Sequence, residues 1–132
     1  MKKFFLAIAA IIICTISGYS AENEYAEATF PNKTHDFGII KEVKGPVTTK
    51  FEFINTGNKP LIIIDAVASC GCTRPEYPKR PIAPGKKGVI KVTYSPIGRP
   101  GAFKKNIKIK TNGREKVTAL YIEGTCIPMD KN

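Results

Sequence analysis

Three cysteines are the residues of this chain best suited to chemistry. Cys70 and Cys72 belong to the segment SCGCT at 69–73, and Cys126 lies near the C-terminus. Two thiols one residue apart can bind a soft metal ion, exchange disulfides with another protein, or form a structural bridge. The choice among these decides whether the chain has a reactive or metal-binding site or acts only through its binding surface.

Four interpretations of these thiols are open from the sequence. A disulfide from Cys126 to Cys70 or Cys72 would tie the loop to the last strand, provided the Cα atoms come within about 7 Å. A Cys70–Cys72 bridge would close a small, strained and reducible ring. A copper(I) or zinc site would need a further ligand, and His35, the only histidine, is the candidate. In the fourth interpretation Cys126 is a core residue and the loop thiols only cap a strand. No other cofactor is expected.

The first 20 residues have the layout of a secretory signal peptide. Lysines precede an apolar stretch at 4–16, and Gly18 and Ser20 supply small residues for cleavage after Ser20. The stretch is short for a membrane span, although an N-terminal anchor is the alternative. Ile13 before Cys14 disfavours a lipoprotein. We therefore expect export to the periplasm or outside the cell, with no transmembrane anchor after cleavage.

Export also constrains the thiols and the charge. Cleavage removes one of four cysteines, so at least one remaining thiol must be free, metal-bound or paired between molecules. Loss of two lysines lowers the formal net charge from +10 to +8. This balance suits anionic partners, but export argues against nucleic acid as one of them.

The elements that must position the thiols are short apolar runs separated by turn signals. Strands are expected at 28–30 with 35–40 (one broken strand), 49–54, 61–68, 89–94, 103–110 and 117–126. Four prolines within residues 75–84 predict a loop or a ragged edge there. Lys105 breaks the alternation of its strand, which predicts a bulge or an open rim.

This pattern predicts an all-β fold, an immunoglobulin-like β-sandwich of about seven strands, with a partly closed barrel as the alternative. The sandwich domain is expected at 34–127, after a leader and first strand start at 21–33 and before a tail at 128–132. The strands at 61–68 and 117–126 should both run antiparallel to 103–110. Their ends, and with them the three thiols, should meet at one end of the sandwich.

Several short tags occur in a fixed order along the chain. They are HDFG at 35–38, FEFINTG at 51–57, SCGCT at 69–73 and PG at 84–85. This set resembles a bacterial secreted family of unknown function, which is similar in turn to the ASPM–SPD-2–Hydin and major sperm protein domains. The resemblance covers residues 34–127 and implies an immunoglobulin-like fold used for binding.

Basic residues cluster on the last predicted hairpin and form a candidate anion-docking surface. The alternative is a solvated face that protects a sheet edge. The set comprises Lys104, Lys105, Lys108, Lys110, Arg114 and Lys116.

Catalytic machinery is missing from the sequence. With one histidine and no glycine-rich loop that opens a helix, neither a common triad nor a phosphate cradle can be built. We therefore predict a non-catalytic binding or scaffolding module of the cell envelope, whose partner is a protein or an anionic envelope component. The alternative is a thiol protein that binds a soft metal or exchanges disulfides through Cys70 and Cys72.

Overall fold

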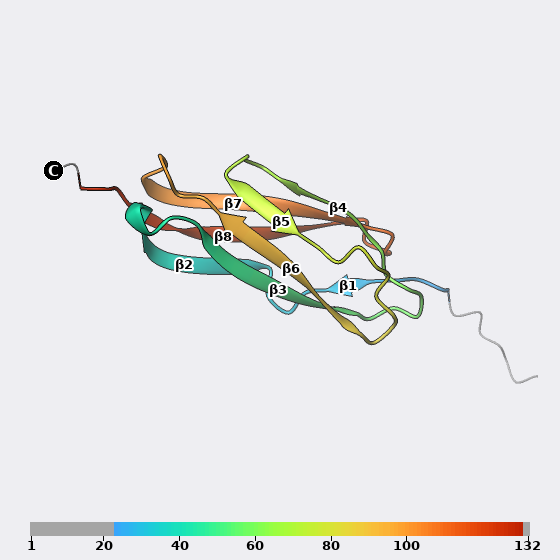
Figure 1. The fold of residues 1–132 in the computed structure, drawn as a ribbon. Helices are drawn as coiled ribbons and strands as arrows, with labels where there is room; N and C mark the ends of the chain where they lie inside the picture. The colour runs from blue at the N-terminus through green and yellow to red at the C-terminus, as the bar shows by residue number, and fades with distance from the viewer. Residues whose placement is uncertain (1–22, 131–132) are drawn as a thin grey trace, which may run out of the picture.

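A computed structural model describes residues 23–130, which form two four-stranded sheets. The first has the order β1-β3-β6-β5, with bounds β1 Ala28–Thr29, β3 Val47–Asn55, β6 Lys87–Tyr94 and β5 Thr73–Glu76. The second has the order β2-β8-β7-β4, with bounds β2 Thr34–Lys41, β8 Val117–Ile127, β7 Gly101–Thr111 and β4 Ile63–Ala68. A 3-10 turn, η1, spans Glu42–Lys44. The two ends of the described chain lie at opposite ends of the sandwich (Figure 1).

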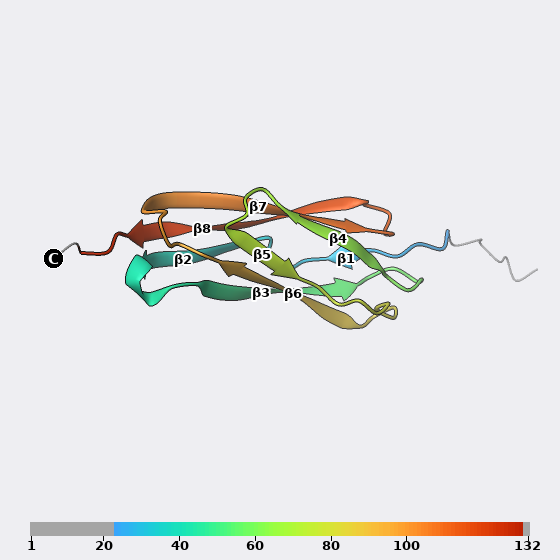
Figure 2. The ribbon, with the colours of Figure 1, turned by 45° about the horizontal axis from the view of Figure 1, so that its top comes forward.

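The core lies between the two sheets, which face each other in Figure 2. Residues alternate along each strand, so Phe51 and Phe53 of β3 are buried whereas Glu52 between them is exposed. Tyr94 of β6 stacks on Phe103 of β7 across the core, with 4.1 Å between ring centroids. The expected all-β, immunoglobulin-like sandwich is confirmed.

The interruption of the first strand that the sequence predicted is present, and the structure places its two parts in different sheets. β1 pairs antiparallel with β3, whereas β2 pairs in parallel with β8. The β2 ladder shifts register between Asp36 and Ile39, where Gly38 has a φ of 68° and donates its N–H to Asp36 Oδ1 at 2.8 Å. A side chain would be strained at that φ, so Gly38 permits the bend.

The proline-rich stretch and Lys105 are the two places where the local structure differs from, or decides between, the sequence predictions. The start of the proline-rich stretch belongs to β5, a short strand that the sequence did not predict. Pro75 is tolerated because β5 is an edge strand paired only with β6. β7 pairs with β8 continuously from Gly101 to Lys110, so Lys105 marks no bulge. Its side chain is half-buried beyond the end of β4, which makes the open rim the correct interpretation.

Asn55 fastens the end of the sandwich where the described chain begins. Its side chain is fully buried, and Nδ2 donates to the carbonyls of Lys59 at 2.7 Å and Ile82 at 2.9 Å. Oδ1 accepts the backbone N–H of Gly57 at 3.0 Å and of Glu27 at 3.3 Å. One amide thus joins its own turn to two segments that are far away in the sequence, at Glu27 and at Ile82.

Gly57 is required beside Asn55 for a steric reason. A Cβ on Gly57 would clash with the Tyr25 carbonyl oxygen and would lie 2.7 Å from Ala26 Cα. The close packing of residues 25–26 on this turn therefore excludes any side chain.

Two expectations concern the membrane and export. The expected signal peptide at 1–20 lies outside the described residues. Within residues 23–130, no helix is long and apolar enough to cross a membrane.

Candidate functional site

The loop that carries Cys70 and Cys72 connects β4 in one sheet to β5 in the other, and backbone hydrogen bonds hold it to both. Ser69 donates its N–H to the Asn106 carbonyl of β7 at 3.0 Å. Ser95, which follows β6, donates its N–H to the Cys72 carbonyl at 2.8 Å. The loop is therefore fixed at each end without help from its side chains.

Cys70 and Cys72 form a disulfide within this loop, at a sequence separation of 2. Of the four interpretations, the structure contains this short bridge. Such a small ring restricts the unfolded chain little, and the chain-entropy relation gives about 1.6 kcal/mol, against about 3 kcal/mol for a 15-residue loop. The bridge is therefore a weak staple.

The two sulfurs have different surroundings. Cys70 is half-buried, whereas Cys72 is only 5% exposed and belongs to the core. The backbone N–H of Cys72 donates to Cys70 Sγ at 3.1 Å. The hydroxyl of Thr73 lies 3.6 Å from Cys72 Sγ. Each sulfur thus has a polar hydrogen nearby, but only Cys70 is accessible.

Cys126 is a free, buried thiol in the core. The prediction of a disulfide from Cys126 to Cys70 or Cys72 is therefore wrong, and its interpretation as a core residue is confirmed. Its Sγ lies 4.0 Å from the Pro96 carbonyl oxygen. Burial raises the pKa of the Cys126 thiol, and the nearby Glu42 carboxylate raises it further.

Strand length explains why the disulfide prediction failed. β4 and β8 both pair antiparallel with β7, as expected. However, β4 ends with Ala68 opposite Ile107, which in turn pairs with Leu120. Cys126 lies six residues beyond Leu120, or roughly 20 Å along β8.

The predicted metal site does not assemble. His35 pairs with Ile122 in the β2–β8 ladder, four positions from Cys126, and its ring meets that of Phe37 edge-on at 4.6 Å. Among residues 23–130 no three His, Cys, Asp or Glu side chains are grouped so as to hold a metal ion. With Cys70 and Cys72 joined to each other, no described thiolate pair is free to bind one.

The six predicted basic residues do not share one surface. Lys104, Lys108 and Lys110 alternate with buried residues along β7 and are exposed on the outer face of its sheet. Lys105 is half-buried on the inner side, as described above. Arg114 forms an ion pair with Glu27 at 2.9 Å. Lys116 Nζ donates to the carbonyl of Asn112 at 3.4 Å in the same turn. Anion docking therefore remains a prediction for the β7 face alone.

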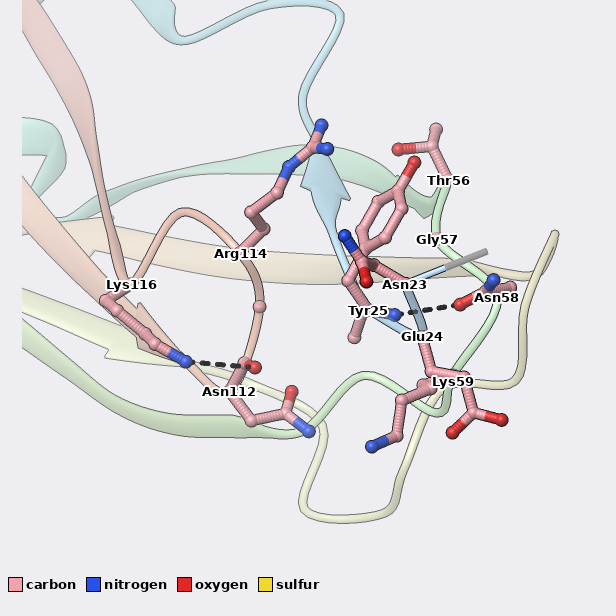
Figure 3. Close-up of a pocket in the computed structure, with 12 residues that line it drawn as sticks. Asn23, Glu24, Tyr25, Thr56, Gly57, Asn58, Lys59, Asn112, Arg114 and Lys116 are labelled. Carbon is pink, nitrogen blue, oxygen red and sulfur yellow. Dashed lines mark hydrogen bonds between the residues drawn. The ribbon is translucent and has the colours of Figure 1, made fainter. Parts of the chain in front are cut away.

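An open pocket of about 910 Å³ lies beside Arg114, between residues 23–26, 56–59 and 112–116 (Figure 3). The backbone N–H of Tyr25 donates to Asn58 Oδ1 at 2.8 Å at its edge. The Arg114 guanidinium lies 4.2 Å from the Tyr25 ring centroid. No histidine or cysteine lines the pocket, and Glu27 offsets the Arg114 charge. The pocket has no nucleophile paired with a base.

An apolar surface that the sequence analysis missed lies at the opposite end of the sandwich. There η1, the connection between β6 and β7, and the end of β8 come together (Figures 1 and 2). Four aliphatic residues of these segments are exposed, and we call them the apolar tip: Val43 (69%), Ile97 (56%), Ile127 (44%) and Met129 (45%).

Glu42 holds the segments of the apolar tip together. Its Oε1 accepts the N–H of Gly98 at 2.8 Å, and its Oε2 accepts the N–H of Met129 at 3.0 Å. One carboxylate thus links η1 to the β6–β7 connection and to the chain after β8. The sequence offered one sign of this surface: Val43 and Ile97 are aliphatic residues in turn segments, which contribute little to the core.

Comparisons with known structures agree with the sandwich architecture. A protein of unknown function from Porphyromonas gingivalis W83 is 13% identical, with a TM-score of 0.68 over 77% of this chain and 47% of that one. The seventh PapD-like (ASH) domain of human CEP192 is 9% identical, with a TM-score of 0.63 over 80% of this chain and 89% of that one. These likenesses show the fold alone.

A third similar structure is the secreted serine protease VesC of Vibrio cholerae. It is 13% identical, with a TM-score of 0.57 over 79% of this chain but only 24% of VesC. The chain thus spans about half of the Porphyromonas protein and a quarter of VesC. No curated protein matches the chain significantly. The family model described as a protein of unknown function, DUF1573, matches residues 28–126. The chain therefore belongs to the DUF1573 family.

Proposed function

We propose that this protein is an exported, non-catalytic immunoglobulin-like module that binds another protein of the cell envelope through its apolar tip. The observation that carries the proposal is the exposure of the four aliphatic side chains at one end of the sandwich. Val43 and Ile97 are the most exposed of them, at 69% and 56%. Grouped apolar side chains left in water are characteristic of interaction sites.

The charges near the apolar tip indicate what kind of partner it fits. Among the exposed charged residues of these segments, Lys41, Lys44 and Arg99 outnumber Asp130, and the partly buried Glu42 carboxylate accepts the N–H groups of Gly98 and Met129. An apolar centre with a positive rim complements a protein patch that is apolar at its centre and acidic at its edge.

The edge of β4 also exposes aliphatic side chains, but it is less suited to docking. Ile64 is 59% exposed, and it lies where the β4–β7 register shifts between Ile63 and Asp65. The Tyr77 hydroxyl donates to the Ile64 carbonyl at 3.4 Å. A bulge and an occupied carbonyl both hinder the addition of a further strand.

Export is the second part of the proposal, and it rests on the layout of residues 1–20. The mature protein should begin at Ala21, which intact-mass measurement of the cell-envelope protein checks directly. A mass that retains residues 1–20 would contradict this part.

Envelope fractionation of cells that express the full chain tests binding through the apolar tip. The wild-type protein should sediment with the envelope and stay there in a high-salt wash, because apolar contacts are not screened. Val43→Asp combined with Ile97→Asp should release it, whereas Ile64→Asp, matched in exposure and chemistry, should not. Protease treatment of stripped envelopes should abolish rebinding of added protein.

Three outcomes would overturn the proposal. The double variant could sediment like the wild type, or Ile64→Asp could release the protein equally. Rebinding that survives protease treatment would identify lipid or polysaccharide, and not protein, as the partner.

A further inference from the structure

The Cys70–Cys72 bridge contributes more chemistry than stability. The hydrogen bonds that Ser69 and Cys72 make to Asn106 and Ser95 already hold the loop to both sheets. A third local bond, from the Thr73 N–H to the Cys70 carbonyl at 3.2 Å, closes the turn itself. A bridge across one intervening residue adds little constraint to such a loop.

Burial makes the two sulfurs unequal as targets. A thiolate from another molecule must approach along the S–S axis to the sulfur that it attacks. Cys70 is half-buried in an exposed loop, whereas Cys72 is 5% exposed within the core. Only Cys70 Sγ is open to attack, and Cys72 is then the leaving sulfur.

The polar groups around the bridge suit the negative charges that such a reaction creates. The Cys72 N–H already points at Cys70 Sγ, 3.1 Å away, and would stabilise a thiolate on Cys70. The Thr73 hydroxyl, 3.6 Å from Cys72 Sγ, can donate to a thiolate on Cys72.

A lysine of β7 is the nearest basic residue by register. Ser69 donates its N–H to the Asn106 carbonyl, and Asn106 donates its own N–H to Ser69 Oγ at 3.3 Å. Continuing the β4–β7 register two residues past the end of β4 sets the backbone of Cys70 opposite that of Lys105. A positive charge there would lower the cost of a Cys70 thiolate, which makes the half-buried Lys105 the candidate positioning residue for the proposal below.

We propose that Cys70–Cys72 is a redox-active disulfide that exchanges with dithiols of exported proteins, with Cys70 as the attacked sulfur. A partner thiolate bonds to Cys70 Sγ, the Cys70–Cys72 bond breaks, and the electron pair leaves on Cys72 Sγ. The second partner thiolate then attacks the partner sulfur of the mixed disulfide and releases Cys70 as a thiolate. The partner loses two electrons as its disulfide forms, and the loop gains them as two thiols. This activity goes beyond the proposed binding function and does not depend on the apolar tip.

Single-thiol variants of the full mature chain test the order of attack. In a Cys126→Ala background, Cys72→Ser leaves only Cys70 and Cys70→Ser leaves only Cys72. With glutathione disulfide at neutral pH, the Cys70 thiol should form a mixed disulfide at least about tenfold faster than the Cys72 thiol, as followed by intact mass. Circular dichroism establishes that each variant is folded.

The pH profile of the Cys70 reaction separates chemistry from structure. The rate should reach half its maximum below the ordinary cysteine pKa of about 8.5. Lys105→Gln should move this midpoint upward, and Lys105→Arg should restore it. Wild-type protein treated with dithiothreitol should gain two hydrogens in intact mass, one each on Cys70 and Cys72, while it stays folded.

Equal rates for the two single-thiol variants, or a faster Cys72, would overturn the order of attack. A bridge that dithiothreitol reduces only after the protein unfolds would overturn redox activity altogether. Neither result would affect binding through the apolar tip, so the two proposals can fail separately.

Discussion

At the scale of single residues, Asn55 shows how one polar side chain organises an end of the sandwich. Its amide is fully buried yet satisfied by four backbone partners, two of them from distant segments of the chain. A buried amide with all its partners stabilises the fold, whereas removing it leaves those partners without hydrogen bonds in an apolar environment.

We predict that Asn55→Ala lowers the free energy of unfolding by about 3 kcal/mol, because two carbonyls and two N–H groups lose their shared partner. Urea unfolding measures the loss. Asn32→Ala, on an exposed turn, is the control and should stay within about 0.5 kcal/mol of wild type. Equal effects from the two substitutions would contradict this account of Asn55.

Cys126 makes a second prediction at this scale. Burial raises its pKa above the ordinary cysteine value, so the folded protein holds the thiol proton more tightly than the unfolded chain does. This contribution to stability is complete below the ordinary cysteine pKa and is lost as the pH rises through the raised pKa. Burial also raises the pKa of Tyr94, which adds a loss of the same sign above pH 10.0.

Urea unfolding at a series of pH values from 7 upward measures this dependence. The unfolding free energy should fall at alkaline pH, and Cys126→Ala should make the fall smaller. The Phe103 ring that stacks on Tyr94 does not titrate. The pH dependence that remains in Cys126→Ala therefore belongs to Tyr94 and to other titrating groups. An identical pH dependence in wild type and Cys126→Ala would contradict the inferred direction of the shift.

At the scale of elements, Glu42 is the clamp of the end that carries the apolar tip. We predict that Glu42→Ala speeds amide hydrogen exchange at Gly98 and Met129, because both N–H groups lose a charged acceptor. Exchange in the centre of β3 should not change. Glu52→Ala, exposed on β3, is the matched control. Unchanged protection at both amides would show that other contacts hold these segments.

The elements also show how far the sequence determines the site. Alternation in β3, β6, β7 and β8 placed most of the core correctly, because a period of two identifies the buried face. It could not place β5, since Pro75 is compatible with either a loop or an edge strand. The Cys70–Cys72 bridge was among the predicted alternatives, but the choice between them depended on where β4 ends. Strand ends are set by packing, which periodicity does not report.

The apolar tip was missed for a related physical reason. An aliphatic residue in a turn can pack inward or face water, and only tertiary structure decides between the two. Val43 lies inside the short turn η1 and Ile97 lies between a proline and a glycine, so neither belongs to a periodic pattern of apolar residues. The exposed β7 lysines, in contrast, follow from alternation alone.

At the scale of the whole molecule, two features occupy opposite ends and the third lies between the two sheets. The segments that line the open pocket lie at the end where the described chain begins, and the segments that carry the apolar tip lie at the other end (Figure 1). The thiol loop bridges the two sheets between β4 and β5, and its Cys72 carbonyl accepts the N–H of Ser95, two residues before Ile97 of the apolar tip. A module so arranged can bind through one end while its disulfide stays accessible. Binding and exchange can therefore be altered independently by substitution.

Site-specific photo-crosslinking in intact cells tests the central claim, that the apolar tip is the binding surface, most directly. A photoreactive amino acid is placed at Val43 in one version of the full chain and at Ile64 in another. We predict one discrete crosslinked protein from position 43, which disappears when Ile97→Asp is added, and no such product from position 64. A product from position 64 alone, or equal products from both, would contradict the claim.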